Sequence, residues 1–232
     1  MKFQSAEFKE ELVAQCLDTF KHGTTKSLYN ILPQISILHD PRLIPPLVGL
    51  LRKAERPNRE FAALALGTMQ SDLALKPLYV AFINRENLVG TGSQALQTAL
   101  LVAIGGIGGD KAVDYLAKLY DYTFKGDRFF RKRRQLVLSS LGEIAQQGNR
   151  RAEAILVGFL GDKDAVVRAQ AVVELSTAYW QRPNELSAEV IQRLLRLTRD
   201  PKSLVKEAAV SSLMNLADLG SKPCEELFRP SA

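Results

Sequence analysis

The sequence predicts an all-α protein, a right-handed α-solenoid of about six stacked helix pairs. Two observations lead to this prediction. One short pattern recurs at nearly constant spacing along the 232 residues, which is typical of repeat architectures. Around each copy, apolar residues follow the 3.6-residue period of a helix and not the two-residue period of a strand. The composition, 46% hydrophobic and 24% charged, is that of a chain able to bury a core.

The recurring pattern begins with a basic or polar residue, continues with small and apolar residues, and ends with a Leu and a small residue. Its clear copies are Arg59–Gly67, Arg134–Gly142 and Arg168–Ser176, and weaker copies are Gln97–Gly105 and Lys206–Met214. Successive copies begin 38, 37, 34 and 38 residues apart. Five copies in register indicate one structural unit that is repeated.

Each copy lies on a predicted amphipathic helix and follows a second such segment. The preceding segments are Leu43–Arg52, Leu73–Asn84, Ala112–Tyr122, Ala152–Leu160 and Ala188–Arg199. A helix pair cannot bury its apolar side alone, so neighbouring pairs stack, and small residues such as Ala62 and Ala171 allow close approach. We expect the second helix of each pair to line a concave face.

We expect one domain, residues 1–232, with repeats over 39–220. Residues 1–38 carry a divergent capping pair, Ser5–Phe20 and Thr25–Leu38, and residues 221–232 are expected to be a tail. The chain lacks an apolar run of membrane-spanning length, and its first residues lack a signal peptide's apolar stretch. Two cysteines outside any CxxC pair indicate a reduced, cytoplasmic protein.

At the repeat turns the sequence resembles the HEAT family, particularly its short bacterial subset. The family has an Asp in the turn and a Val-Arg or Val-Lys pair opening the second helix. Asp162 precedes Val167-Arg168, and Asp200 precedes Val205-Lys206, at the same offset. The resemblance implies an Asp/Arg ladder between neighbouring repeats. Its members by position are Arg59, Arg134, Arg168 and Lys206 with Asp162 and Asp200, and Gln97 departs from the pattern.

This resemblance is specific for fold and says little about function. We expect a non-catalytic protein-binding scaffold, adaptor or assembly factor without a cofactor. The short subset also includes phycobilin lyases of the E/F type and phycobilisome-degradation proteins. The alternative is therefore a phycobilin lyase-like or phycobilisome-associated protein that handles bilin-bearing phycobiliproteins, with a bilin chromophore as ligand; if the chain is an enzyme, it is of this lyase-like kind.

One segment stands out by charge. Residues 125–134 hold six basic residues and one acidic residue, so they carry +5 of the net charge of +6. Six of the 17 aromatic residues lie nearby, between Tyr115 and Phe130. We expect contact with a protein of acidic surface, through Lys125, Arg128, Phe129, Phe130, Arg131, Lys132 and Arg133. The alternative contact is the concave face around Gln94, Gln97, Gln170 and Glu174.

Other conspicuous residues have structural explanations. A lone Trp near a helix end more often packs between repeats, so Tyr179-Trp180 is expected to be structural. Cys16 is expected in the core, His39 in a turn, and the glycines of 105–109 at a helix end. A single basic spot and a single Trp argue against a nucleic-acid binder or a helical-repeat DNA glycosylase. The two His and two Cys are badly placed for a metal site.

Overall fold

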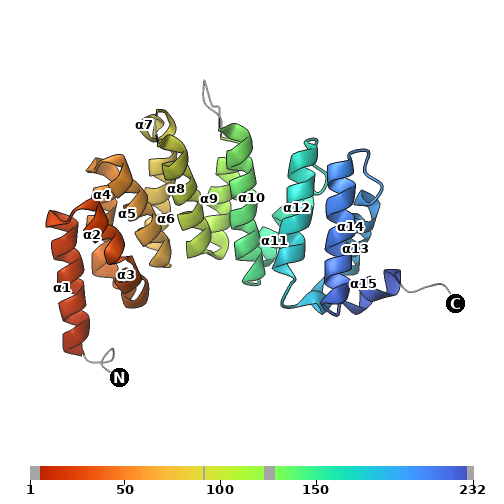
Figure 1. Cartoon of the computed structure of the whole chain (residues 1–232), viewed down its shortest axis with the longest axis horizontal. Coiled ribbons are helices and arrows are strands. Elements are labelled where there is room, and N and C mark those ends of the chain that lie inside the picture. Colours follow the sequence, from red (N-terminus) through yellow and green to blue (C-terminus); the bar gives the residue numbers. More distant parts are fainter. Residues whose placement is uncertain (1–5, 91, 123–128, 229–232) are drawn as a thin grey trace. The chain divides into compact units, whose positions relative to one another are not determined.

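The computed structural model describes residues 6–90, 92–122 and 129–228, and regular structure over these ranges is helical throughout. The chain is an all-α helical-repeat solenoid, as its sequence predicts (Figure 1). Internal packing divides it into two compact units, Met1–Arg133 and Arg134–Ala232, and each is described by itself.

The first unit contains the N-terminal helices and the first repeats. Its helices are α1 (Ala6–His22), α2 (Thr25–Asn30), α3 (Leu32–Leu38), the 3-10 turn η2 (Pro41–Leu43), α4 (Ile44–Lys53), α5 (Arg56–Thr68), α6 (Asp72–Ile83), α7 (Arg85–Leu88), α8 (Ser93–Ile107) and α9 (Gly109–Tyr120). Helix α5 packs on both α4 and α8. The predicted segment Thr25–Leu38 is broken near Ile31, because Pro33 cannot donate to the helix ladder and instead lies in the first turn of α3.

The second unit contains most of α10 (Phe130–Gln146), followed by α11 (Arg150–Phe159), α12 (Ala165–Ala178), η3 (Pro183–Glu185), α13 (Ala188–Leu197), α14 (Ser203–Asp218) and α15 (Lys222–Leu227). Helices α12 and α14 lie side by side, and α11 and α13 pack against them (Figure 1). The expected tail of residues 221–232 begins instead with a helix. Its Cys224 is fully buried, and α15 packs against α14.

Three glycines show how the sequence fixes the repeats. Gly108 and Gly109 have φ values of 73° and 76° and separate α8 from α9, so the glycine-rich stretch is a helix end as expected. At Gly67, helices α5 and α8 approach so closely that an added Cβ would lie 2.7 Å from the Cα of Ala103.

An ionic contact fastens α1 to the first repeat. Asp40 is 5% exposed and accepts hydrogen bonds from the backbone N–H and the guanidinium of Arg42. Arg42 also donates to both carboxylate oxygens of Glu10 on α1, at 2.8 and 2.9 Å. The Arg42 guanidinium lowers the pKa of Asp40 to about 2.

We expect acid to weaken the first unit through Asp40. Because the folded pKa lies below that of an unfolded Asp, about 3.9, the stabilisation is complete above about pH 4. It is lost as the pH falls towards about 2. Urea unfolding followed by circular dichroism between pH 5 and pH 2 measures this slope. The Asp40→Asn variant should show a shallower slope, and equal slopes for the two proteins would contradict the assignment.

Candidate functional site

The predicted basic segment lies at the start of α10. Lys125 and Arg128 fall outside the described residues. Phe129 and Phe130 are half-buried, whereas Arg131 and Lys132 are exposed. Arg131 and Lys132 lie in the first turn of α10, at the positive end of the helix dipole. No acidic residue of that turn offsets their charge, so they lower the stability of the helix. Among the described residues of the basic segment, the exposed ones are therefore the pair Arg131 and Lys132.

Arg133 is not part of that exposed segment, and the prediction that it contacts a partner is wrong. It is fully buried, and its guanidinium donates to the backbone carbonyl of Tyr122. The guanidinium carbon lies 5.9, 5.8 and 5.4 Å from the ring centroids of Phe82, Tyr122 and Phe130. These rings surround the cation and compensate part of its lost hydration.

The repeat pattern shows how unusual this burial is. Arg133 immediately precedes the repeat residue Arg134, as Val167 and Val205 immediately precede Arg168 and Lys206. Both valines are buried. Arg133 therefore occupies a core position that is apolar in the two following repeats, where the rings of Phe82, Tyr122 and Phe130 lie next to it.

At the ladder positions, the structure joins Arg168 on α12 to Asp200 at the turn before α14. The guanidinium donates to both carboxylate oxygens at 2.9 Å, and to the backbone carbonyl of Asp162 at 2.8 Å. Both side chains are largely buried, at 13% and 7% exposed. The hydrogen bonds from Arg168 lower the pKa of Asp200. The carboxylate of Asp162 has a separate role, accepting from the backbone N–H of Asp164.

The other ladder positions differ from this arrangement. Arg59 donates to the side-chain oxygen of Asn87 at 2.7 Å and to the carbonyl of Ala54, so its inter-repeat partner is neutral. Gln97 is fully buried, with only a 3.4 Å bond to a backbone carbonyl, so it cannot line a contact surface. Arg134 is half-buried, and Lys206, in the last repeat, is exposed.

The surface formed by α12 and α14 in the second unit carries exposed apolar side chains. Val166 and Val173 lie seven residues apart on one side of α12, and Trp180 follows at the same spacing, just after the helix ends. They are 40%, 45% and 61% exposed. On α14, Val210 and Met214 are also exposed, one turn apart. We call this set the α12/α14 surface.

Trp180 corrects an expectation. It was expected to pack between repeats, but that place is taken by its neighbour Tyr179, which is fully buried. The Tyr179 hydroxyl accepts from Arg150, and Arg182 lies 4.9 Å from its ring centroid. Burial raises the pKa of Tyr179 to about 12. The seven-residue spacing of Val166, Val173 and Trp180 is the sequence signal that could have identified this exposed row.

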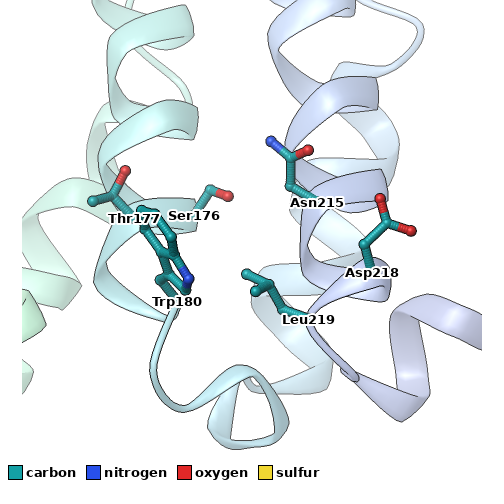
Figure 2. Close-up of a pocket in the computed structure, with 6 residues that line it drawn as sticks. All are labelled: Ser176, Thr177, Trp180, Asn215, Asp218 and Leu219. Atoms are coloured by element: carbon teal, nitrogen blue, oxygen red, sulfur yellow. The ribbon is translucent and has the colours of Figure 1, made fainter.

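A pocket of about 360 Å³ opens between α12 and α14. Figure 2 shows its lining, with the Trp180 indole on one side and Leu219 facing it from the end of α14. The polar groups of the lining belong to Ser176, Thr177, Asn215 and Asp218. The pocket therefore has two apolar walls, and Asp218 lies at its edge with the carboxylate directed away from the indole (Figure 2).

Two further carboxylates lie where α10 approaches α12. Glu174 accepts hydrogen bonds from the hydroxyl of Ser139 at 2.7 Å and from the amide of Gln170. Burial, with a contribution from the charge of Glu174, raises the pKa of Glu143. Glu143 and Glu174 make no ion pair within the part of the chain that the structure describes.

The first unit has a groove of about 430 Å³ between α3, α5 and α8. Its lining consists of Leu32, Ser36, His39, Leu64, Gly67, Thr68, Gln70, Val102, Ala103 and Gly106. His39 and Gln70 adopt left-handed conformations with φ of 44° and 49°. His39 ends α3 there and contacts the carbonyl of Met69, so it is a turn residue as expected.

Cys16 is buried in the core, which raises the pKa of its thiol.

Among the described residues, no three His, Cys, Asp or Glu side chains gather as a metal site would require. None of the described helices is long and apolar enough to cross a bilayer.

Comparison with known proteins supports the helical-repeat fold. A family model described as HEAT repeats matches residues 126–214, so this stretch is similar to HEAT repeats. That description does not extend to the finer resemblance to phycobilin lyases. No curated protein matches the chain.

Two solved structures are similar at low identity. Human deoxyhypusine hydroxylase in complex with glycerol is 15% identical, with 89% of this chain and 84% of that chain covered and a TM-score of 0.42. An engineered protein is 20% identical, with 85% and 90% covered and a TM-score of 0.39. Neither similarity carries an argument about function.

Proposed function

We propose that this chain is a non-catalytic protein-binding scaffold that uses the α12/α14 surface as its main contact. The observation that supports this proposal is the row of exposed apolar side chains ending at Trp180, 61% exposed beside a pocket. Exposed apolar side chains that gather on one surface mark interaction sites, and Trp is the residue most enriched among binding hot spots. Solenoids typically bind partners through such extended surfaces.

The exposed pair Arg131 and Lys132 is proposed as a second, electrostatic contact for an acidic partner. Cations in the first turn of a helix cost about 0.3–1 kcal/mol each, so they oppose the stability of α10. A contribution to binding is a reason for a sequence to retain them. Such exposed charges mainly change the rate of association and its dependence on salt, and they contribute less to the affinity.

We expect partner capture to depend on the α12/α14 surface. The double variant Val173→Gln/Met214→Gln removes two exposed apolar side chains and should remain folded, because both are nearly half exposed. A protein captured by the immobilised wild-type chain from a source-cell lysate, identified by mass spectrometry and then purified, should bind this variant at least about tenfold more weakly, or about 1.4 kcal/mol.

A matched control is available on α6. Leu73→Gln/Val80→Gln also removes two exposed apolar side chains, but from a first helix, and binding should be unchanged. The variant Arg131→Glu/Lys132→Glu should be at least as stable as wild type and should bind an acidic partner more weakly. If the wild type, the Val173→Gln/Met214→Gln variant and the Arg131→Glu/Lys132→Glu variant all bind the partner equally, neither surface contacts it.

A further inference from the structure

We propose that the pocket between α12 and α14 binds a lysine or arginine side chain on an extended segment of a partner protein. The cation would lie over the indole of Trp180 and beside the carboxylate of Asp218. This inference rests on the proposed scaffold function and adds the chemical class of the ligand. It follows from the aromatic wall, the position of Asp218 and the dipole of α14, which ends at Asp218.

The Trp180 indole is an open ring for a cation. Trp offers the strongest cation–π interaction among the side chains. Elsewhere in the described chain, rings near cations are already occupied: Arg182 lies 4.9 Å from the ring centroid of Tyr179, and Lys118 lies 5.5 Å from that of Tyr115. Within the described residues no cation lies over Trp180, and its ring faces the pocket (Figure 2).

Asp218 supplies the negative charge. It is the last residue of α14, where the helix dipole is already negative and an additional anion is unfavourable. Asp218 is exposed, and over the described ranges it makes no hydrogen bond or ion pair through its carboxylate. A cation placed in the pocket interacts favourably with both the carboxylate and the end of the helix.

The neighbouring helices α10 and α12 end on the same side as α14. Helices α10, α12 and α14 run parallel, because the contacts between them advance in the same direction along the sequence. Between α10 and α12, Ser139 contacts Glu174 and Ala145 contacts Arg182. Between α12 and α14, residues 176–180 and 215–219 line the pocket together. Glu143 lies in the last turn of α10, and Glu174 about one turn before the end of α12.

Arg182 donates to the carbonyls of Ala145 and Ala178 and so offsets the negative charge at the ends of α10 and α12, but among the described residues no basic side chain is bonded to Asp218. Arg168 is bound to Asp200, and Lys206 is three turns from Asp218 along α14, roughly 18 Å. The negative charge of Asp218 disfavours phosphate groups and therefore nucleic acid or an anionic membrane as the ligand of this pocket.

The remaining lining suits a long basic side chain. Leu219 offers an apolar wall for the methylene stem, as in partly buried Lys and Arg residues. The Ser176 hydroxyl and the Asn215 side-chain oxygen can accept hydrogen bonds from an ammonium or guanidinium group. The Thr177 hydroxyl already donates to the carbonyl of Val173.

The test is a binding titration of the full chain with a fluorescein-labelled peptide of four Ala-Arg units, followed by fluorescence anisotropy. We expect saturable binding that weakens as salt is added, and binding at least about tenfold weaker when Gln replaces Arg in the peptide. Trp180→Ala and Asp218→Asn should each weaken binding at least about tenfold. Leu204→Ala should leave binding unchanged, because Leu204 is an apolar residue, 51% exposed, near the other end of α14.

Three results would overturn the inference: no saturable binding, equal binding of the Arg and Gln peptides, or undiminished binding by folded Trp180→Ala and Asp218→Asn variants. A peptide copying residues 125–134 tests a second copy of this chain as the occupant. If only that peptide binds, and the chain self-associates in sedimentation, the partner is not a different protein. The two proposals can also fail separately. If the Val173→Gln/Met214→Gln variant loses capture of the partner protein but the wild-type chain binds no peptide, the scaffold function stands and only the cationic ligand is rejected.

Discussion

Replacing Arg168 by Ala is expected to lower the free energy of unfolding of the second unit by about 2–3 kcal/mol. The change removes a bidentate ion pair between Arg168 and Asp200 of neighbouring repeats, and a hydrogen bond to the Asp162 carbonyl. It also leaves the carboxylate of Asp200, 7% exposed, without its cation. Partial solvent access to Arg168 keeps the cost below that of a fully buried pair. The single Trp of the chain, Trp180, lies in this unit, so its fluorescence during urea unfolding follows the transition.

Lys206 is the matched control for Arg168. It occupies the same position of the repeat pattern on α14, but it is exposed and, in the described chain, forms no ion pair. Lys206→Ala should therefore change the free energy of unfolding by less than about 0.5 kcal/mol. Equal losses in the two variants would assign the effect to the helix position and not to Asp200.

Replacing Gly67 by Ala is expected to lower the free energy of unfolding of the first unit by about 2–3 kcal/mol. The new methyl group would lie 2.7 Å from the Cα, 2.9 Å from the Cβ and 3.2 Å from the carbonyl oxygen of Ala103. Two of these are backbone atoms of α8, so no rotation of a side chain relieves the overlap. Helices α5 and α8 must move apart, which weakens the packing between them. Thermal or urea unfolding followed by circular dichroism measures the loss.

Gly49 on α4 is the control for Gly67, because an added Cβ there meets no atom within 4 Å. Gly49→Ala should raise the free energy of unfolding by about 0.5–1 kcal/mol, since Ala loses less backbone entropy in a helix. The two substitutions are chemically identical and opposite in expected sign. If Gly67→Ala were as stable as Gly49→Ala, the close approach of α5 and α8 would be refuted.

The sequence by itself determined the helical-repeat fold. The recurrence of one pattern and its helical period depend on local spacing and on which residues must be buried, and both can be read along a single chain. All five segments predicted before the repeat copies overlap helices of the structure, from α4 to α13. The break at Ile31 and the helix α15 were missed, because a break caused by one proline and a helix of only six residues leave no periodic signal.

Only the tertiary structure decided which of the conspicuous residues are accessible. Arg133 and Arg131 are two residues apart and carry the same charge, yet one is enclosed by aromatic rings from three segments and the other faces water. Tyr179 and Trp180 are adjacent, yet one is buried and the other is 61% exposed. The direction of a side chain at a helix end depends on the neighbouring helices, and so does the pocket between α12 and α14. Spacing along one helix cannot specify what another helix, about 40 residues away, places opposite it.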